Sequence, residues 1–226
     1  MYSNQPWYPS PLMAASSVHD TCHIIEVSGE GTVTAPPDRA IIELGVITEN
    51  PSLTIAQKDN AAAIANIVHS LIQLNIPEEH IQTVSYRIEI QYHYADGKQI
   101  FRGYQVNHML QITLSQVDQT GLVVDTAVNH GANTVSSIRF SIARPEIYYN
   151  HSLTLALKNA ESKAMTIART LGASLVRHPI KVLEETPTRE PRPYQASLYA
   201  ESATATPIQP GELKITAAIK VHYAYQ

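Results

Sequence analysis

The sequence predicts an α+β fold, with largely antiparallel sheets and about three helices packed on their faces. Long segments with two-residue alternation, such as 212–225, are typical of strands that bury one face. Other segments carry apolar residues at three- and four-residue steps, which is typical of amphipathic helices. Neighbouring strand segments are joined by short turns, which favours antiparallel pairing. The expected order of elements is β-β-α-β-β-α-β-α-β-β.

Two strands are predicted at the start of the domain. The first covers 24–34, where Gly29-Glu30-Gly31 is expected to interrupt the strand as a glycine bulge. The segment Ala35-Pro36-Pro37-Asp38 predicts a turn, because proline fixes φ and the Asp side chain can bond its own backbone. Residues 40–49 alternate again and predict the second strand.

A helix and a long hairpin are predicted next. Asn50-Pro51 is suited to cap and open a helix, whose apolar stripe continues to Asn75. The alternation over 84–114 is interrupted only by Asp96-Gly97, which is a strong hairpin signal. Both arms exceed the usual strand length, so we expect the hairpin to bend or bulge near Gly103.

The second half of the domain is predicted to hold two helices and three strands. Asp118 is expected to cap a short helix over 117–130, and strands are expected at 135–142, 180–185 and 212–225. Pro145 is expected to open a long helix, and Gly172 to end it. The alanine-rich row of this helix allows close approach to a sheet or another helix; its alanines include Ala156, Ala160, Ala164 and Ala168.

Two segments do not follow the pattern of the domain, which we place at 23–226. Residues 1–22 are rich in Pro, Ser and Asn, which is typical of a flexible tail; the alternative is an arm that docks on a neighbouring subunit. Residues 186–210 hold five prolines, and we expect this loop to pack against a neighbouring subunit. The side chains expected at such an oligomer interface are Trp7, Tyr8, Tyr194, Leu198 and Tyr199.

Composition excludes several classes of protein. The 226 residues are 44% hydrophobic and 16% charged, which is typical of a folded domain rather than a disordered chain. The net charge of -4 argues against a nucleic-acid partner. No apolar run is long enough for a membrane-spanning helix, and residues 1–18 lack the basic start and apolar stretch of a secretory leader. We therefore expect a cytoplasmic protein.

The residues that carry chemistry form no recognisable catalytic, cofactor or metal site. Gly29-Glu30-Gly31 lacks the third glycine and the following helix of a dinucleotide loop. The ten histidines are scattered, without an HExxH motif. Cys22 is the single cysteine, which excludes an intramolecular disulfide and a cysteine-cage metal site. No GxSxG motif marks a nucleophilic serine. We expect no cofactor and no bound metal.

Two positions leave alternatives open. His108 lies in an otherwise apolar strand row, where it is either a buried histidine bonded to a carbonyl or tyrosine, or part of a site. Asp38 is either a turn residue or part of a carboxylate site with Arg39 and Glu43.

Five segments in the same order resemble those of one known family. They are Val27-Ser28-Gly29-Glu30-Gly31 with Pro37-Asp38-Arg39-Ala40, Arg102-Gly103-Tyr104-Gln105-Val106, Gly131-Ala132-Asn133-Thr134 before Phe140-Ser141-Ile142, the alanine-rich helix 156–172, and Pro210-Gly211-Glu212. Together they resemble the SIMPL-domain family, which includes bacterial periplasmic immunogenic and outer-membrane-associated proteins. The resemblance covers residues 23–226.

The resemblance implies an α+β fold, large and sometimes channel-like oligomers, and a loose link to stress tolerance or signalling. It implies no catalytic residues. Members are commonly exported, so export or association with the cell envelope is the alternative to a cytoplasmic location. Two hypotheses follow. The chain is a non-enzymatic protein whose partner is itself, or it is an unrecognised enzyme or ligand-binding protein with a site at a subunit cleft around Arg102 and His108.

Overall fold

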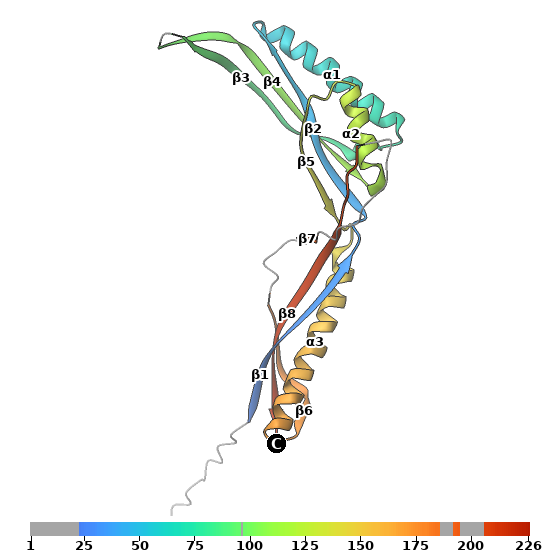
Figure 1. The fold of residues 1–226 in the computed structure, drawn as a ribbon, viewed down its shortest axis with the longest axis vertical. Coiled ribbons are helices and arrows are strands. Elements are labelled where there is room, and N and C mark those ends of the chain that lie inside the picture. Colours follow the sequence, from blue (N-terminus) through green and yellow to red (C-terminus); the bar gives the residue numbers. More distant parts are fainter. Residues whose placement is uncertain (1–22, 96, 186–191, 195–205) are drawn as a thin grey trace, which may run out of the picture.

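The chain forms two elongated lobes joined end to end, each built from one antiparallel sheet and its helices (Figure 1). This computed structural model describes residues 23–95, 97–185, 192–194 and 206–226. Trp7, Tyr8, Leu198 and Tyr199 lie outside the described residues, and Tyr194 is described only by its backbone pairing. The strands and helices of the described part are β1 (Ile24–Ala35), β2 (Arg39–Asn50), α1 (Leu53–Gln73), β3 (Ile81–Ala95), β4 (Lys98–Leu114), α2 (Thr120–Asn129), β5 (Thr134–Ser141), α3 (Pro145–Thr170), β6 (Leu175–Glu185), β7 (Arg192–Tyr194) and β8 (Glu212–Tyr225).

The predicted fold class is confirmed, and the order of elements differs from the prediction by one short strand. β7 lies inside the proline-rich segment and pairs with the start of β8. β6 begins at Leu175, earlier than the predicted 180, because its pairing with β8 continues past Pro179 through two register shifts. A proline interrupts the hydrogen-bond ladder of a strand. The alternation of side chains alone therefore does not reveal the first part of β6.

The sheet with strand order β1-β8-β6 forms the lower lobe in Figure 1, and α3 packs along one of its faces. The buried row of β8 is the predicted one, from Leu213 to Tyr223. The buried row of α3 consists of small side chains, namely Ser152, Ala156, Ala160, Ala164 and Ala168. The prediction of a close approach through the alanine row is confirmed, and the partner is the sheet.

The predicted glycine bulge in β1 is wrong. β1 pairs with β8 in unbroken register from Ile24 to Ala35. A Cβ atom at Gly29 would lie 2.2 Å from the carbonyl oxygen of Ala156, and one at Gly31 would lie 2.0 Å from that of Ser152. The two glycines are therefore required because the backbone of α3 packs directly on β1.

The sheet with strand order β3-β4-β2-β5 forms the upper lobe, and α1 and α2 cover one of its faces (Figure 1). Its core brings together Ile42 and Leu44 of β2, Ile67 of α1 and Val123 of α2. The hairpin bulge predicted near Gly103 is confirmed, because the β3–β4 register shifts where Gln91 pairs with Gly103 and the next residue pairs with Phe101.

Helix boundaries follow the predictions only in part. Pro145 lies in the first turn of α3, and Gly172 follows its end with φ of 70°, as predicted. Asn50 does not cap α1; its Oδ1 accepts a bond of 2.9 Å from the amide of Ser52, which precedes the first helical residue. No side-chain bond caps α2, so the prediction for Asp118 is also wrong.

Asp38 joins the two lobes. Its Oδ1 accepts a hydrogen bond of 2.6 Å from the amide of Ala143, and its own amide donates to the carbonyl of Ser141 at 3.2 Å. These bonds tie the turn between β1 and β2 to the connection between β5 and α3. The interpretation of Asp38 as a turn residue is thus confirmed, with a long-range partner that the sequence does not reveal.

The end of the proline-rich segment is tied to the upper lobe. Thr206 donates from its amide and its hydroxyl to the carboxylate of Asp125 on α2, at 2.9 and 2.5 Å. These bonds lower the pKa of Asp125. Ile208 packs against the core of the upper lobe.

Candidate functional site

The most prominent surface of the upper lobe is an apolar face on the β3–β4 hairpin. We call it the hairpin face, and its members are Val84, Tyr86, Ile88, Ile90, Tyr92, Tyr94 and Phe101, each between 39% and 75% exposed. The alternation of β3 predicts a strand with one buried face, yet α1 packs mainly on β2 and β4, and the apolar side chains of β3 stay largely exposed. Exposed apolar surfaces of this kind mark sites of interaction.

The hairpin face also has an open backbone edge. β3 is an edge strand of its sheet, so one side of its backbone pairs with no other strand among the described residues. Near the tip, the ring of Phe101 makes edge-on contacts with Tyr92 and Tyr104, with centroids 6.4 and 5.4 Å apart. An edge strand with an apolar face is suited to pair with another chain.

A groove lies at the base of the hairpin, between α1 and β3. We call it the α1–β3 groove; its volume is about 540 Å³. Its lining consists of Gln57, Asn60, Ala61, Ile64, Ala65, Val68, His69 and Ile72 from α1, with Tyr86 and His108 from the hairpin. The lining contains no Asp, Glu, Lys or Arg, and most of its side chains are apolar.

Asn60 is the buried polar residue of the groove. Only 1% of its surface is exposed, and its Nδ2 donates to the carbonyl oxygens of Val46 and Val106 at 2.9 and 3.2 Å. Its Oδ1 is buried and has no hydrogen-bond partner among the described residues. Asn60 lies at the helical spacing of the apolar stripe of α1, a pattern that does not show which of its atoms remains unpaired.

His108 is half-buried at the edge of the groove. Its Nε2 lies 2.9 Å from the hydroxyl of Thr83, and its ring contacts Tyr86 edge-on with centroids 5.2 Å apart. Burial lowers the pKa of His108, so the ring is neutral at pH 7. The expected hydrogen bond to a carbonyl or a tyrosine is not the one observed: Nε2 pairs with the hydroxyl of Thr83, and Tyr86 makes only a ring contact.

Arg102 and His108 do not converge within one chain. They are six residues apart on β4, which corresponds to about 20 Å along an extended strand. Arg102 donates to Glu49 at 2.9 Å, and both residues line a separate cavity of about 180 Å³. The hypothesis of a site around Arg102 and His108 therefore finds no geometric basis in a single subunit.

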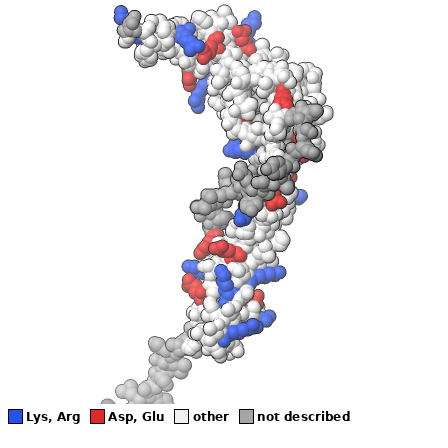
Figure 2. All heavy atoms as spheres, viewed as in Figure 1, with Lys and Arg blue, Asp and Glu red and all other residues white. Residues whose placement is uncertain are grey.

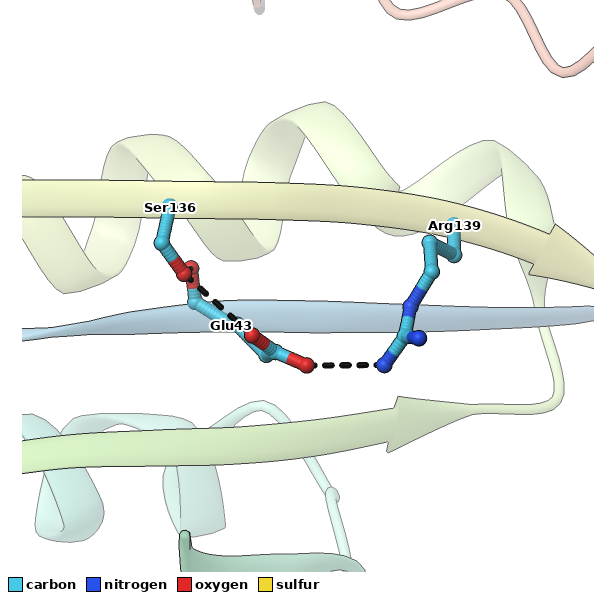
Figure 3. A network of polar contacts seen from close by, with 3 residues as sticks. All are labelled: Glu43, Ser136 and Arg139. Atoms are coloured by element: carbon cyan, nitrogen blue, oxygen red, sulfur yellow. Dashed lines mark hydrogen bonds and ion pairs between the residues drawn. The ribbon is translucent and has the colours of Figure 1, made fainter. Parts of the chain in front are cut away.

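Glu43 belongs to a polar contact between β2 and β5 rather than to a carboxylate site. Its Oε1 accepts from Arg139 at 2.7 Å, and its Oε2 accepts from the hydroxyl of Ser136 at 3.4 Å (Figure 3). Asp38 is engaged at the junction of the lobes, so the carboxylate-site alternative is wrong. Ion pairs of this kind on an exposed sheet face contribute little stability.

The described ranges hold neither a metal-binding cluster nor a membrane-spanning helix. Among those residues, no three His, Cys, Asp or Glu side chains lie close enough to share a metal ion. In the same part of the chain, no helix combines the length and the apolar character needed to cross a membrane.

The architecture thus defines a two-lobed α+β protein with an apolar hairpin and an uncharged groove at its base. The chain belongs to the SIMPL family, described as "Protein of unknown function (DUF541)", whose family model matches residues 25–223.

Several known proteins are similar in sequence to this chain. The uncharacterized protein YggE of Escherichia coli K12 is 30% identical over 155 residues, which are 68% of this chain and 62% of that protein. The 26 kDa periplasmic immunogenic protein of Brucella melitensis is 27% identical over 207 residues, 87% of this chain and 82% of the relative. The interleukin-1 receptor-associated kinase 1-binding protein 1 homolog of Danio rerio is 24% identical over 198 residues, 86% of this chain and 74% of the relative.

Proposed function

We propose that this chain is a non-enzymatic protein that assembles with copies of itself through the hairpin face. The observation that supports this function is the continuous set of apolar side chains on β3, exposed beside an unpaired strand edge. Two copies of the same edge can pair antiparallel about a twofold axis, which buries the same side chains from both subunits. Such pairing removes apolar surface from water, which favours association by about 25 cal/mol for each Å².

Names of relatives support binding rather than catalysis. The Danio rerio relative is named as a kinase-binding protein homolog, and the Brucella relative as a periplasmic protein. We extend the proposal to the cell envelope as the place where the assembly acts, in stress tolerance or signalling. A folded chain that exposes a row of large apolar side chains on one strand is better suited to contact proteins than to bind charged substrates.

The assembly is tested by light scattering coupled to size-exclusion chromatography. We expect the wild-type chain to elute with a mass that is a multiple of 24.9 kDa. The double variant Ile88→Lys and Ile90→Lys places two charges on the hairpin face and is expected to elute as a monomer. Its matched control is Leu122→Lys with Val128→Lys, two exposed apolar residues of α2.

The control is expected to keep the assembly mass, because α2 lies outside the hairpin face. A wild-type mass near 24.9 kDa at every concentration would contradict the proposal. An unchanged mass in the hairpin variant would show that copies associate through another surface.

A further inference from the structure

We propose that two copies of this chain pair through β3 in a single register, centred on Ile88, in which Arg87 of each copy faces Glu89 of the partner subunit. This inference rests on the proposed self-assembly and specifies ion pairs that neither copy can form alone. Three features of β3 carry it: the open edge, the regular stretch of the strand and the positions of its two charges.

The open edge of β3 is regular over a limited length. Its register with β4 is unbroken from Ser85 to Gln91 and shifts on both sides, after Thr83 and after Gln91. A bulge disrupts the hydrogen-bond ladder and bends the strand, so a further strand pairs best between such irregularities. Ile88 lies at the centre of this stretch, with equal lengths of strand on either side.

The side chains of this stretch divide into an apolar and a polar face. Tyr86, Ile88 and Ile90 belong to the hairpin face. Arg87 and Glu89 alternate with them and therefore point to the opposite side of the sheet. Residues directly opposite each other in antiparallel strands share a face, so a partner strand has to match apolar residues with apolar ones and charges with polar residues or charges.

The two charged side chains are available to a second chain. Arg87 and Glu89 are exposed, and neither forms an ion pair with any residue in the described ranges. Their neighbours across the ladder on β4 are the uncharged Asn107 and Gln105. A partner strand is therefore the place where an opposite charge can meet them.

The charges select one register. A twofold axis between two antiparallel copies of a strand passes beside one residue, which then faces itself. With the axis at Arg87 or at Glu89, like charges would lie directly opposite each other, which destabilises a sheet. With the axis at Tyr86 or at Ile90, neither charge faces one of opposite sign. The axis at Ile88 places Arg87 opposite Glu89 of the partner subunit on both sides of the axis.

The apolar face fits the same register. Ile88 would face Ile88 of the partner subunit at the axis, and Tyr86 would face Ile90 of the partner subunit on each side. Pairs of an aromatic and a β-branched side chain are favourable across neighbouring strands. On the face that Figure 2 shows, positive and negative side chains are interspersed along the hairpin, so no field of a single sign opposes the approach of a second copy.

Disulfide formation measures the register directly. In a Cys22→Ser background, Ile88→Cys would place two thiols at the axis, with Cβ atoms about 5 Å apart, and we expect mild oxidation to yield a covalent dimer on a non-reducing gel. The matched control is Ile90→Cys, an exposed residue of the same face. Its two copies would lie about 14 Å apart along the strands, too far for a disulfide, and should stay uncrosslinked.

Charge reversal tests the ion pairs. Arg87→Glu or Glu89→Arg alone would place like charges opposite each other on both sides of the axis. We expect each single variant to dissociate at a protein concentration at least about fivefold above that of wild type, measured by sedimentation velocity at low salt. The double variant Arg87→Glu with Glu89→Arg restores opposite charges and should return to within about twofold of wild type. Such recovery would not follow from a general loss of stability.

The outcomes separate the register from self-assembly itself. In a chain that still assembles through the hairpin face, crosslinking of Ile90→Cys instead of Ile88→Cys would overturn the register and leave self-assembly standing. Crosslinking of Ile88→Cys, combined with charge variants that assemble like wild type or a double variant that does not recover, would overturn the ion pairs. A wild-type chain that stays a monomer at every concentration would overturn both proposals.

Discussion

At the residue scale, Gly29 and Gly31 are the positions where side-chain size matters most. Both lie on the face of β1 that contacts α3, and an added Cβ would meet backbone atoms of Ala156 or Ser152. Backbone cannot rotate away as a flexible side chain can, so the helix itself would have to move. The same close approach explains why the buried row of α3 contains only alanine and serine.

We expect Gly29→Ala to lower the free energy of unfolding by about 3 kcal/mol, at the upper end of overpacking costs. Urea titration followed by circular dichroism measures the change. The matched control is Ser28→Ala on the opposite, exposed face of the same strand, which should change stability by less than about 0.5 kcal/mol. Equal stability of Gly29→Ala and wild type would mean that α3 does not pack on β1 as described.

The ionisation of Tyr149 makes the free energy of unfolding depend on pH in the alkaline range. Its hydroxyl donates to Glu184 Oε1 at 2.8 Å, and burial, together with this bond and the carboxylate charge, raises its pKa to about 12. The unfolded chain loses this proton near pH 10, so between pH 10 and 12 the native state binds more protons than the unfolded state. The contribution of Tyr149 is therefore full below pH 10 and is lost as pH rises towards 12.

The measurement is urea denaturation of wild type and Tyr149→Phe across this pH range. The difference in stability between the two proteins should shrink as pH rises, because phenylalanine has no proton to lose. A difference that stays constant from pH 9 to 12 would contradict the role of Tyr149. Because the other titrating groups are the same in wild type and in Tyr149→Phe, their contributions cancel in the difference.

At the scale of elements, the proline-rich segment is anchored at both ends. β7 pairs with the start of β8, and Thr206 is bonded to Asp125 on α2. β7 pairs only with the start of β8, at the margin of the sheet, where strand prolines are found. Whether Tyr194, Leu198 and Tyr199 contact a neighbouring subunit stays a prediction.

Replacing residues 195–205 by a Gly-Ser linker of equal length tests that prediction. We expect the melting temperature to change by less than about 5 °C, because the anchored ends remain and a flexible connection costs little. The assembly mass should fall, since the linker removes Leu198 and Tyr199 from the interface. A full assembly mass in this variant would show that the segment is only a connection.

At the scale of the whole molecule, the two lobes meet at a narrow junction (Figure 1). In the described part of the chain, a small cluster of Ala35, Ile142, Leu213 and Ile215 fills the junction. The bonds of Asp38 tie two of the connecting segments together. The relative position of the lobes thus depends on few contacts.

We expect Asp38→Ala to lower stability by about 1 kcal/mol, because it removes one charge-assisted hydrogen bond at an exposed site. It should also broaden the distribution of angles between the lobes. Small-angle X-ray scattering detects this as a wider range of radii of gyration. Asp59→Ala, an exposed carboxylate on α1, is the control and should change neither property. Identical scattering of Asp38→Ala and wild type would show that the apolar cluster alone fixes the lobes.

The sequence alone determined the elements and the class of fold. The alternation of β8, the hairpin turn between Ala95 and Lys98 and the proline and glycine that delimit α3 follow from local signals, and each was predicted. The bulge near Gly103 also follows from a local cause, since one glycine marks a break in a long strand. The family resemblance depended on such segments in their order.

Only the tertiary structure decided what these elements contact. Local alternation cannot tell a strand covered by a helix from one left open, so the exposure of Ile88 and Ile90 was not predictable. Gly29 and Gly31 were misread as a bulge, because the helix that requires them lies more than 120 residues away in the chain. The α1–β3 groove likewise depends on where α1 rests, and that position results from packing over the whole sheet rather than from any segment.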